Sequence, residues 1–229
     1  MGYILLEGGA EFTGRMDLAD RRALEVVGGV GARISIIPTA AAPDRNHEKA
    51  GENGVKWFRQ LGAGNVQWFP LVDKVSANAP AIARALRRSD FIFLLGGFPR
   101  YLADTLRDSL CWEAMLTAEQ RGACLAGSSA GAMVLCERYY DPWHQAMADG
   151  LGLCAGICVV PHHDTYGGDW IPTVAKLFPE GVIIGIDEQT GMLGEGEPGR
   201  WRVYGKGAVT LYRGSRKERF TIDQPFGLA

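Results

Sequence analysis

The chain has 229 residues, of which 47% are hydrophobic and 22% charged, and this balance is typical of a folded globular protein rather than a disordered one. Its 24 basic and 26 acidic side chains give a formal net charge of -2, so there is no basic excess to hold a nucleic-acid backbone. Its 31 glycines follow no G-x-y period, which excludes collagen and indicates many tight turns between strands and helices.

The first residues and the cysteines indicate a cytoplasmic protein. No basic leader precedes Glu7, so no signal peptide is expected. The longest apolar run, residues 151–160, is roughly half of the ~20 residues that span a bilayer, so no membrane association is expected either. The five cysteines form no C-x-x-C pair, and an odd number without a signal peptide is typical of reduced, buried thiols.

Short aliphatic and β-branched runs alternate with amphipathic stretches in the first part of the chain. The predicted strands are residues 3–6, 33–37, 66–69, 91–95 and 124–127, and the predicted helices are residues 17–27, 44–60, 80–87 and 99–121, the last with a break near Ser109. Strands that are apolar on both faces are typical of a parallel sheet covered by helices on both sides. The order therefore predicts an α/β fold with a single doubly wound, mostly parallel sheet.

The pattern changes after about residue 180. Residues 182–187, 191–193, 201–204, 208–212 and 219–222 are predicted short strands, separated by Gly, Pro and charged turns. They predict an antiparallel extension of the same sheet. Because the chain contains no internal repeat, low-complexity tract or linker, we expect residues 1–229 to form one domain.

Residues 124–135, CLAGSSAGAMVL, carry the most informative chemical pattern. A short apolar strand runs into GSSAG at residues 127–131, and a helical pattern follows at once, which is the strand-turn-helix setting of the G-x-S-x-G nucleophile elbow. The turn is so sharp that the serine must adopt a strained backbone, and the two glycines remove Cβ atoms that would collide with neighbours. Ser129 is therefore the predicted nucleophile. The alternative is a small-residue turn that lets a helix pack tightly.

A serine needs a base, and the four histidines are its candidates. His162 and His163 follow the apolar strand 157–160 through Pro161, at the carboxyl edge that a parallel sheet would share with Ser129. Adjacent residues leaving a strand point in opposite directions, so only one of the two is expected to face the serine. We choose His162, against the alternative of an ordinary polar histidine in a loop.

Three acidic residues are candidates for orienting the imidazole. Asp141, in the loop after the elbow helix, is favoured over Glu137, which ends that helix, and over Asp164, two residues beyond His162. The alternative for each is a solvated surface charge.

Backbone N–H groups near Ser129 are expected to form an oxyanion hole. One is the amide of Ala130, which follows the nucleophile. The second is expected from Gly96-Gly97, where a buried strand ends in a glycine pair. The glycine patterns of dinucleotide and nucleotide phosphate sites are both missing, and the predicted chemistry needs no metal and no organic cofactor.

Several segments resemble the serine peptidases grouped around peptidase E (aspartyl dipeptidase) and cyanophycinase, which share a class I glutamine amidotransferase-like, flavodoxin-like fold. The matching segments are residues 8–9 (GG), 36–40 (IIPTA), 95–97 (LGG), 127–132 (GSSAGA), 161–162 (PH), 185–190 (GIDEQT) and 203–209 (VYGKGAV). The resemblance implies Ser129 as nucleophile, His162 as base and an acid from the loop that holds Asp141. It also implies oxyanion donors at Gly97 and Ala130.

The chain departs from these peptidases in three ways. Phe98 and Pro99 stand where cyanophycinases carry Asp-Gln. Residues 162–176 contain no arginine, whereas both named peptidases use arginines there to bind substrate carboxylates. The resemblance therefore implies peptidase chemistry without implying a preference for aspartate. The spacing from Ser129 to Asp141 is also shorter than in peptidase E, which keeps Glu137 as a candidate acid.

These observations predict a cytoplasmic serine hydrolase, similar to peptidase E, that cleaves a short peptide or related amide through an acyl-enzyme. Its expected partner is a small peptide, with self-association into homo-oligomers as a further expectation. One alternative is a cysteine-dependent, amidotransferase-like enzyme, although Cys124 and Cys136 beside the elbow are expected to be core thiols. The other is a binding member of the same fold without activity, which a long distance between Ser129 and His162 would favour.

Overall fold

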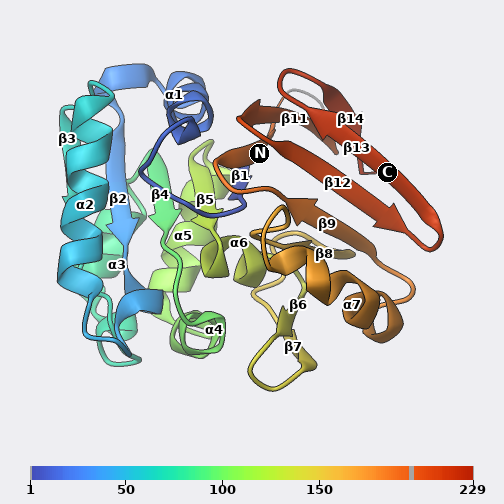
Figure 1. The fold of residues 1–229 in the computed structure, drawn as a ribbon. Coiled ribbons are helices and arrows are strands. Elements are labelled where there is room, and N and C mark those ends of the chain that lie inside the picture. Colours follow the sequence, from blue (N-terminus) through green and yellow to red (C-terminus); the bar gives the residue numbers. More distant parts are fainter. Residues whose placement is uncertain (1, 196–198, 229) are drawn as a thin grey trace.

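The computed structural model describes residues 2–195 and 199–228. An eight-stranded sheet runs through the molecule in the order β14-β11-β10-β1-β5-β4-β2-β3 (Figure 1). Its parallel half consists of β1 (Tyr3–Glu7), β2 (Arg33–Ile37), β3 (Asn65–Trp68), β4 (Phe91–Leu94) and β5 (Cys124–Ser128). The apolar runs predicted each of these strands, so the predicted α/β fold with a mostly parallel sheet is confirmed.

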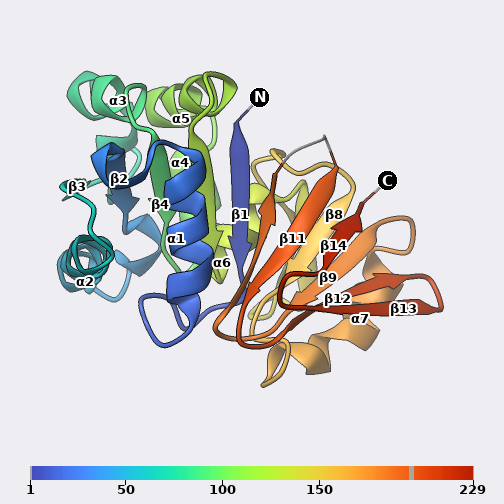
Figure 2. The ribbon, with the colours of Figure 1, turned by 90° about the horizontal axis from the view of Figure 1, so that it is seen from above.

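Helices cover both faces of the parallel half (Figure 2). On one face lie α1 (Met16–Val26) and α2 (His47–Gln60), and on the other lie α3 (Pro80–Leu86), α4 (Pro99–Leu106) and α5 (Leu110–Gln120). The predicted break between the last two helices is present at Ser109. Its hydroxyl accepts a hydrogen bond from the amide of Trp112 at 3.1 Å and so caps the start of α5.

The carboxyl-terminal strands divide between two sheets. β10 (Thr190–Gly194) and β11 (Arg200–Gly205) extend the central sheet by antiparallel pairing, as predicted, and β14 (Pro225–Gly227), which the sequence did not predict, pairs antiparallel with β11. In contrast, β9 (Val182–Ile186), β12 (Ala208–Arg213) and β13 (Arg216–Thr221) join β8 (Ile157–Val160) in a second sheet, in the order β13-β12-β9-β8. The prediction that all the carboxyl-terminal strands extend the central sheet is therefore wrong for β9, β12 and β13, which belong to the second sheet.

The chain passes from the second sheet to the central sheet at residues 187–189, between β9 and β10. The amide of Asp187 donates to the carbonyl of Ala208 in β12 at 3.1 Å, whereas the amide of Gln189 donates to the carbonyl of Gly9 after β1 at 3.2 Å. Gln189 has a φ of 53°, and this left-handed residue redirects the chain. Because residues two positions apart pair with different sheets, the pattern of short strands does not reveal the switch.

The carboxyl ends of β1, β4 and β5 meet at one edge of the central sheet. The register pairs Glu7 with Ser128 and Leu94 with Gly127, so the turns that follow these strands begin side by side. In open parallel sheets this is the edge at which ligands bind.

Several shorter elements complete the fold. The helices are α6 (Ala130–Leu135) and α7 (Ile171–Leu177), the hairpin strands are β6 (Arg138–Asp141) and β7 (Ala146–Asp149), and the 3-10 turns are η1 (Gly29–Gly31), η2 (Thr39–Ala41), η3 (Ser76–Asn78) and η4 (Gly167–Trp170). The hairpin contacts α6 through β6 and α7 through β7, below the central sheet in Figure 1.

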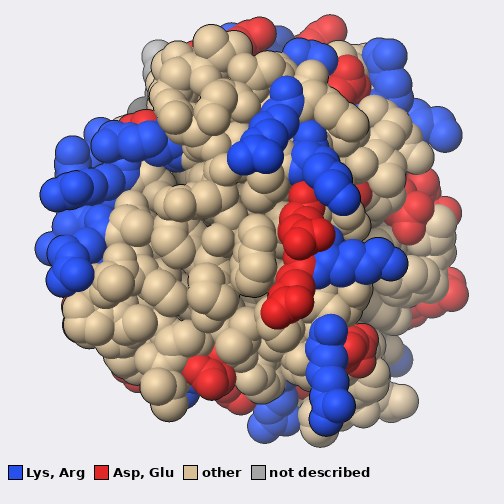
Figure 3. Space-filling view, turned by 90° about the vertical axis from the view of Figure 1, so that its left-hand side faces the viewer, with Lys and Arg blue, Asp and Glu red and all other residues tan. Residues whose placement is uncertain are grey.

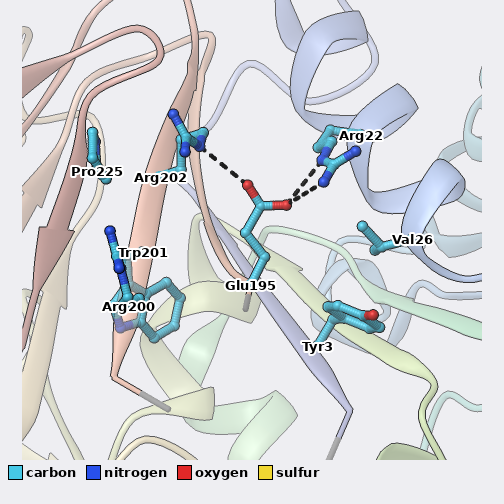
Figure 4. Close-up of a pocket in the computed structure, with 8 residues that line it drawn as sticks. All are labelled: Tyr3, Arg22, Val26, Glu195, Arg200, Trp201, Arg202 and Pro225. Carbon is cyan, nitrogen blue, oxygen red and sulfur yellow. Dashed lines mark hydrogen bonds and ion pairs between the residues drawn. The ribbon is translucent and has the colours of Figure 1, made fainter. Parts of the chain in front are cut away.

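At the other end of β1, one carboxylate joins α1 to the antiparallel strands (Figure 4). Glu195 contacts Arg22 at 2.8 Å and accepts hydrogen bonds from Arg202 Nε at 3.2 Å and the Tyr204 hydroxyl at 2.7 Å. Burial raises the pKa of Glu195, but the hydrogen bonds from Tyr204 and Arg22 outweigh burial and leave the pKa below its ordinary value. The carboxylate therefore stays ionised and ties α1 to β11.

The side of the molecule formed by α2 and β3 carries its charges in separate groups. Figure 3 shows Lys and Arg side chains gathered along the left margin, a column of mixed acidic and basic side chains just right of the middle, and a wide uncharged area between them. Among the described residues, no helix combines the length and the apolarity needed to cross a bilayer.

Candidate active site

Ser129 occupies a strained turn between β5 and α6. Its φ of 49° and ψ of −112° lie outside the regions that ordinary residues adopt, as the elbow motif predicts. A Cβ on Gly127 would collide with the backbone of Gly131, and a Cβ on Gly131 would collide with the carbonyl of Leu94 in β4. Both glycines are therefore required for the helix to start directly against the sheet.

His162 reaches Ser129 from the segment after β8. The Ser129 hydroxyl oxygen lies 2.9 Å from His162 Nε2. The backbone amide of His162 donates to the carbonyl of Gly8 at 2.7 Å, and Gly9 lies so close to the imidazole that a Cβ there would overlap it. The turn after β1 thus fixes the position of His162, although β8 belongs to the second sheet.

Glu188 is the carboxylate that contacts His162. Its Oε1 lies 2.9 Å from His162 Nδ1, and its backbone amide donates to Asp164 Oδ1 at 2.8 Å. The side chain of Glu188 is about one-third exposed, at 35%. Because Glu188 lies where the chain changes sheets, the same turn that redirects the backbone brings the carboxylate to His162.

The acids expected from the sequence make other contacts, so the expected contact of His162 with Asp141 or Glu137 is corrected to a contact with Glu188. Asp141 is buried, and its Oδ2 lies 2.7 Å from His144 Nδ1. Glu137 accepts a hydrogen bond from the amide of Gly156 at 2.9 Å. Asp164 touches the site only through the backbone of Glu188. Glu188 was not among the acids predicted from the sequence, which were chosen for their closeness to the elbow helix or to His162. It lies, however, in segment 185–190, which is one of the segments that resemble the peptidase family.

The side chain of His163 points away from Ser129, as predicted for the neighbour of His162, because adjacent residues leaving a strand point in opposite directions. Its Nδ1 lies 3.0 Å from Asp187 Oδ1 and its Nε2 lies 2.8 Å from the Tyr212 hydroxyl. Burial raises the pKa of Asp187, but the hydrogen bonds from His163 and from the amide of Ala208 outweigh it and leave the pKa lowered. Two neighbouring residue pairs, His162 with Glu188 and His163 with Asp187, therefore join the same two segments.

The two residues expected to donate oxyanion hydrogen bonds, Gly97 and Ala130, lie beside Ser129. Gly97 and Ala130 both line the cavity that contains Ser129. In the described part of the chain the amide of Gly97 has no hydrogen-bond acceptor, and the amide of Ala130 is the first of α6, where a helix leaves its N–H groups unpaired. Gly97 has a φ of 134°, and a Cβ there would overlap the carbonyl of Ala40, so only glycine fits.

The cysteines are unsuited to nucleophilic chemistry. All five are buried and free of disulfides. Burial raises the pKa of Cys111 to about 11 and the pKa values of Cys154 and Cys158 to about 12, and it raises the pKa values of Cys124 and Cys136 well above the ordinary value. None supplies a thiolate near neutral pH, which disfavours the cysteine-dependent alternative. Within residues 2–195 and 199–228, no group of three His, Cys, Asp or Glu side chains is placed to hold a metal ion.

A serine hydroxyl that contacts an imidazole, whose second nitrogen meets a carboxylate, is the arrangement with which serine hydrolases generate a nucleophile. The short distance between Ser129 and His162 disfavours the alternative of a binding protein without activity. On this α/β fold, the nucleophile elbow and its histidine define the class of the protein as a serine hydrolase.

Comparison with known proteins narrows this class to a family. Residues 4–200 match the model of peptidase family S51, and the chain therefore belongs to that family of serine peptidases. It is 30% identical to a cyanophycinase of Trichormus variabilis, over 91% of this chain and 72% of the relative, and 27% identical to a cyanophycinase of Geminocystis herdmanii, over 92% and 80%. The crystal structure of a peptidase from an acI-B1 Actinobacterium has a TM-score of 0.88 and 28% identity, covering 99% of this chain and 97% of that one.

Proposed function

We propose that the chain cleaves short peptides with Ser129 as nucleophile, His162 as general base and acid, and Glu188 as the carboxylate that orients His162. The proposal is carried by one observation, the continuous line of contacts from the Ser129 hydroxyl to His162 Nε2 and from His162 Nδ1 to Glu188, each at 2.9 Å. Family membership supports the peptidase reaction, and the geometry supports the assignment of these three residues to it.

The reaction would proceed through an acyl-enzyme. Ser129 Oγ attacks the peptide carbonyl while His162 Nε2 takes the hydroxyl proton, and the same proton then passes to the leaving amine as the C–N bond breaks. Water attacks the resulting ester with His162 again as base, which releases the acid and restores the serine. The carboxylate of Glu188 stabilises the imidazolium formed in each half of the reaction.

The amides of Gly97 and Ala130 are proposed to bind the negative oxygen of the tetrahedral intermediate. Their free N–H groups and their place beside Ser129 support this role. Removing one such donor from a serine hydrolase typically costs about 100- to 1,000-fold in kcat.

The size of the cavity supports a short substrate. It has a volume of about 290 Å³, which is at the lower end of the range for small-molecule sites, about 300–1,000 Å³. A dipeptidase activity fits this size. Because relatives with about 30% identity are named cyanophycinases, cyanophycin belongs in the same set of test substrates.

The proposal is tested by comparing wild type, Ser129→Ala and Ser215→Ala on a dipeptide panel and on cyanophycin. Ser215 is exposed in the turn between β12 and β13, so its loss of a hydroxyl is a matched control. We expect Ser129→Ala to lose at least about 1,000-fold in kcat/KM, and Ser215→Ala to retain the wild-type rate. Turnover by Ser129→Ala equal to that of wild type would overturn the assignment of the nucleophile.

A further inference from the structure

The cavity in front of Ser129 has apolar and aromatic walls. Apart from Ser129, His162 and the two amide donors, the lining includes Pro99, Met133, Pro142, Trp143, Tyr166 and Trp170. Its volume of about 290 Å³ is enough for one bulky side chain beside the reacting carbonyl. The walls come from α4, α6, the β6–β7 hairpin and the segment between β8 and α7, so they enclose the serine from several sides.

The aromatic walls are held in place by rings behind them. Trp143 stacks on Phe98 with ring centroids 5.6 Å apart and an angle of 18° between the planes. Trp170 contacts Tyr140 at 5.8 Å, and Tyr166 stacks on the imidazole of His162 at 4.8 Å. Walls fixed in this way are ready to receive an apolar group with little loss of side-chain freedom on binding.

Asp141 fixes the turn that carries Trp143. Its Oδ1 accepts hydrogen bonds from the amides of Trp143 at 3.0 Å and His144 at 3.3 Å, and its Oδ2 contacts the His144 ring. The aspartate is buried, whereas 64% of Trp143 is exposed at the mouth of the cavity. The acid that the sequence suggested for the triad is therefore a positioning residue for this wall.

The charges around the cavity are unfavourable for an acidic substrate side chain. Of the described residues, no lysine or arginine lines the cavity, and the exposed Arg100 that follows Pro99 lies outside it. Glu188 lies against His162, and Glu11 accepts hydrogen bonds from the Gly96 amide at 3.3 Å and the Ser128 hydroxyl at 3.1 Å. Burial raises the pKa of Tyr166, and the negative charges of Glu188 and Glu11 raise it further. A substrate carboxylate in this cavity would be desolvated and would be repelled by these two nearby carboxylates.

We infer that this cavity binds the side chain of the residue that is transferred to Ser129, and that it selects an aromatic or large aliphatic side chain over an acidic one. The inference rests on the proposed function. The carbonyl carbon must lie between the Ser129 hydroxyl and the amides of Gly97 and Ala130, and the side chain branches from the next carbon atom. It therefore enters the same cavity, where aromatic walls bury it and where none of the described lysines or arginines lines the wall to pair with a carboxylate.

Binding to the Ser129→Ala variant tests the inference without hydrolysis. Isothermal titration would compare the dipeptides Phe-Ala, Leu-Ala and Asp-Ala, which share their second residue. We expect Phe-Ala and Leu-Ala to bind at least about tenfold more tightly than Asp-Ala, since an unpaired carboxylate in this cavity costs more than 1.4 kcal/mol. Equal or tighter binding of Asp-Ala, or no binding of any of the three, would overturn the inference.

A second variant links the selectivity to the aromatic wall. Adding Trp143→Ala to the Ser129→Ala protein should weaken Phe-Ala binding about three- to tenfold and leave Asp-Ala binding nearly unchanged, because one ring contact is lost. Leu110→Ala removes an exposed apolar side chain outside the cavity and is the matched control. An equal effect of both substitutions on Phe-Ala, with folding confirmed by circular dichroism, would contradict the role of Trp143.

Hydrolysis by the wild-type enzyme separates this inference from the proposed function. Tight binding of Phe-Ala without cleavage would overturn the proposed function and support the selectivity of the cavity. Cleavage of Asp-Ala in preference to Phe-Ala would support the proposed function and overturn the selectivity.

Discussion

At the scale of single residues, the contact between Ser129 and His162 could be predicted from the sequence, but the contact of His162 with Glu188 could not. Ser129 lies in a local motif, and His162 follows an apolar strand, so both could be predicted from their immediate neighbours. Glu188 is 26 residues from His162 and reaches it only because the chain changes sheets beside it. Asp141 instead fixes a hairpin turn, a role that the sequence around it does not distinguish from that of a catalytic acid.

Replacing Glu188 by glutamine tests the corrected acid. The amide keeps the size of the side chain but removes the negative charge that stabilises the imidazolium, so we expect kcat to fall about 100- to 10,000-fold with a small change in KM. Glu137→Gln, at the acid that contacts Gly156, is the control and should retain activity. If Glu137→Gln lost as much activity as Glu188→Gln, the assignment of Glu188 would be wrong.

At the scale of elements, apolar runs and glycines predicted the parallel strands, and the elbow motif predicted the turn between β5 and α6. Gly127 and Gly131 were predicted to be required as glycines because a Cβ atom at either position would collide with its neighbours. The close approach of β5, α6 and β4 at these positions confirms this prediction. The second sheet could not be predicted in the same way. Strands of both sheets are short and bounded by similar turns, and only the long-range pairing of β9 with β12, rather than with β1, separates them.

The contact between β1 and α1 contains a buried carboxyl pair, Glu7 and Asp20. In the described part of the chain the Glu7 carboxyl oxygens have no hydrogen-bond partner, and Asp20 accepts a hydrogen bond from Trp57 at 2.7 Å. Burial raises the pKa of Glu7 well above its ordinary value, and the charge of Asp20 raises it further. Burial likewise raises the pKa of Asp20, to about 7, against the opposing effect of the Trp57 hydrogen bond. The backbone carbonyl of Glu7 also accepts a hydrogen bond from the amide of Ser129, so the strand that carries Glu7 contacts the turn that carries Ser129.

This pair predicts a pH-dependent stability. Between pH 3.8 and about 7 the folded chain holds a proton on Asp20 that the unfolded chain releases, so the free energy of unfolding should fall as the pH rises, by roughly 1 kcal/mol per pH unit. The stabilisation is complete below pH 3.8 and is lost as the pH passes 7. The free energy of unfolding can be measured by urea denaturation at several pH values. It should change less steeply with pH in Asp20→Asn than in wild type or in the exposed Asp44→Asn. Identical slopes in all three proteins would contradict the raised pKa.

At the scale of the whole molecule, segments far apart in the chain meet at one edge. Ser129 follows β5, His162 follows β8 and Glu188 follows β9. The turn after β1 holds His162, and the turn after β4 contains Gly97, the proposed second oxyanion donor. Because β8 and β9 belong to the second sheet, the site lies where the two sheets meet. Self-association of the chain stays a prediction, which sedimentation of the purified protein would test.

The most direct test of this assignment is reaction with a small fluorophosphonate, followed by intact-mass measurement and peptide mapping. We expect one adduct per chain, located on Ser129, because among the described residues it is the serine whose hydroxyl contacts an imidazole oriented by a carboxylate, whereas the hydroxyl on His163 is the phenol of Tyr212. The adduct should be absent from Ser129→Ala and should form much more slowly in His162→Ala. Inactivation of the wild-type enzyme with the adduct on another residue, and with Ser129 unmodified, would contradict the central assignment.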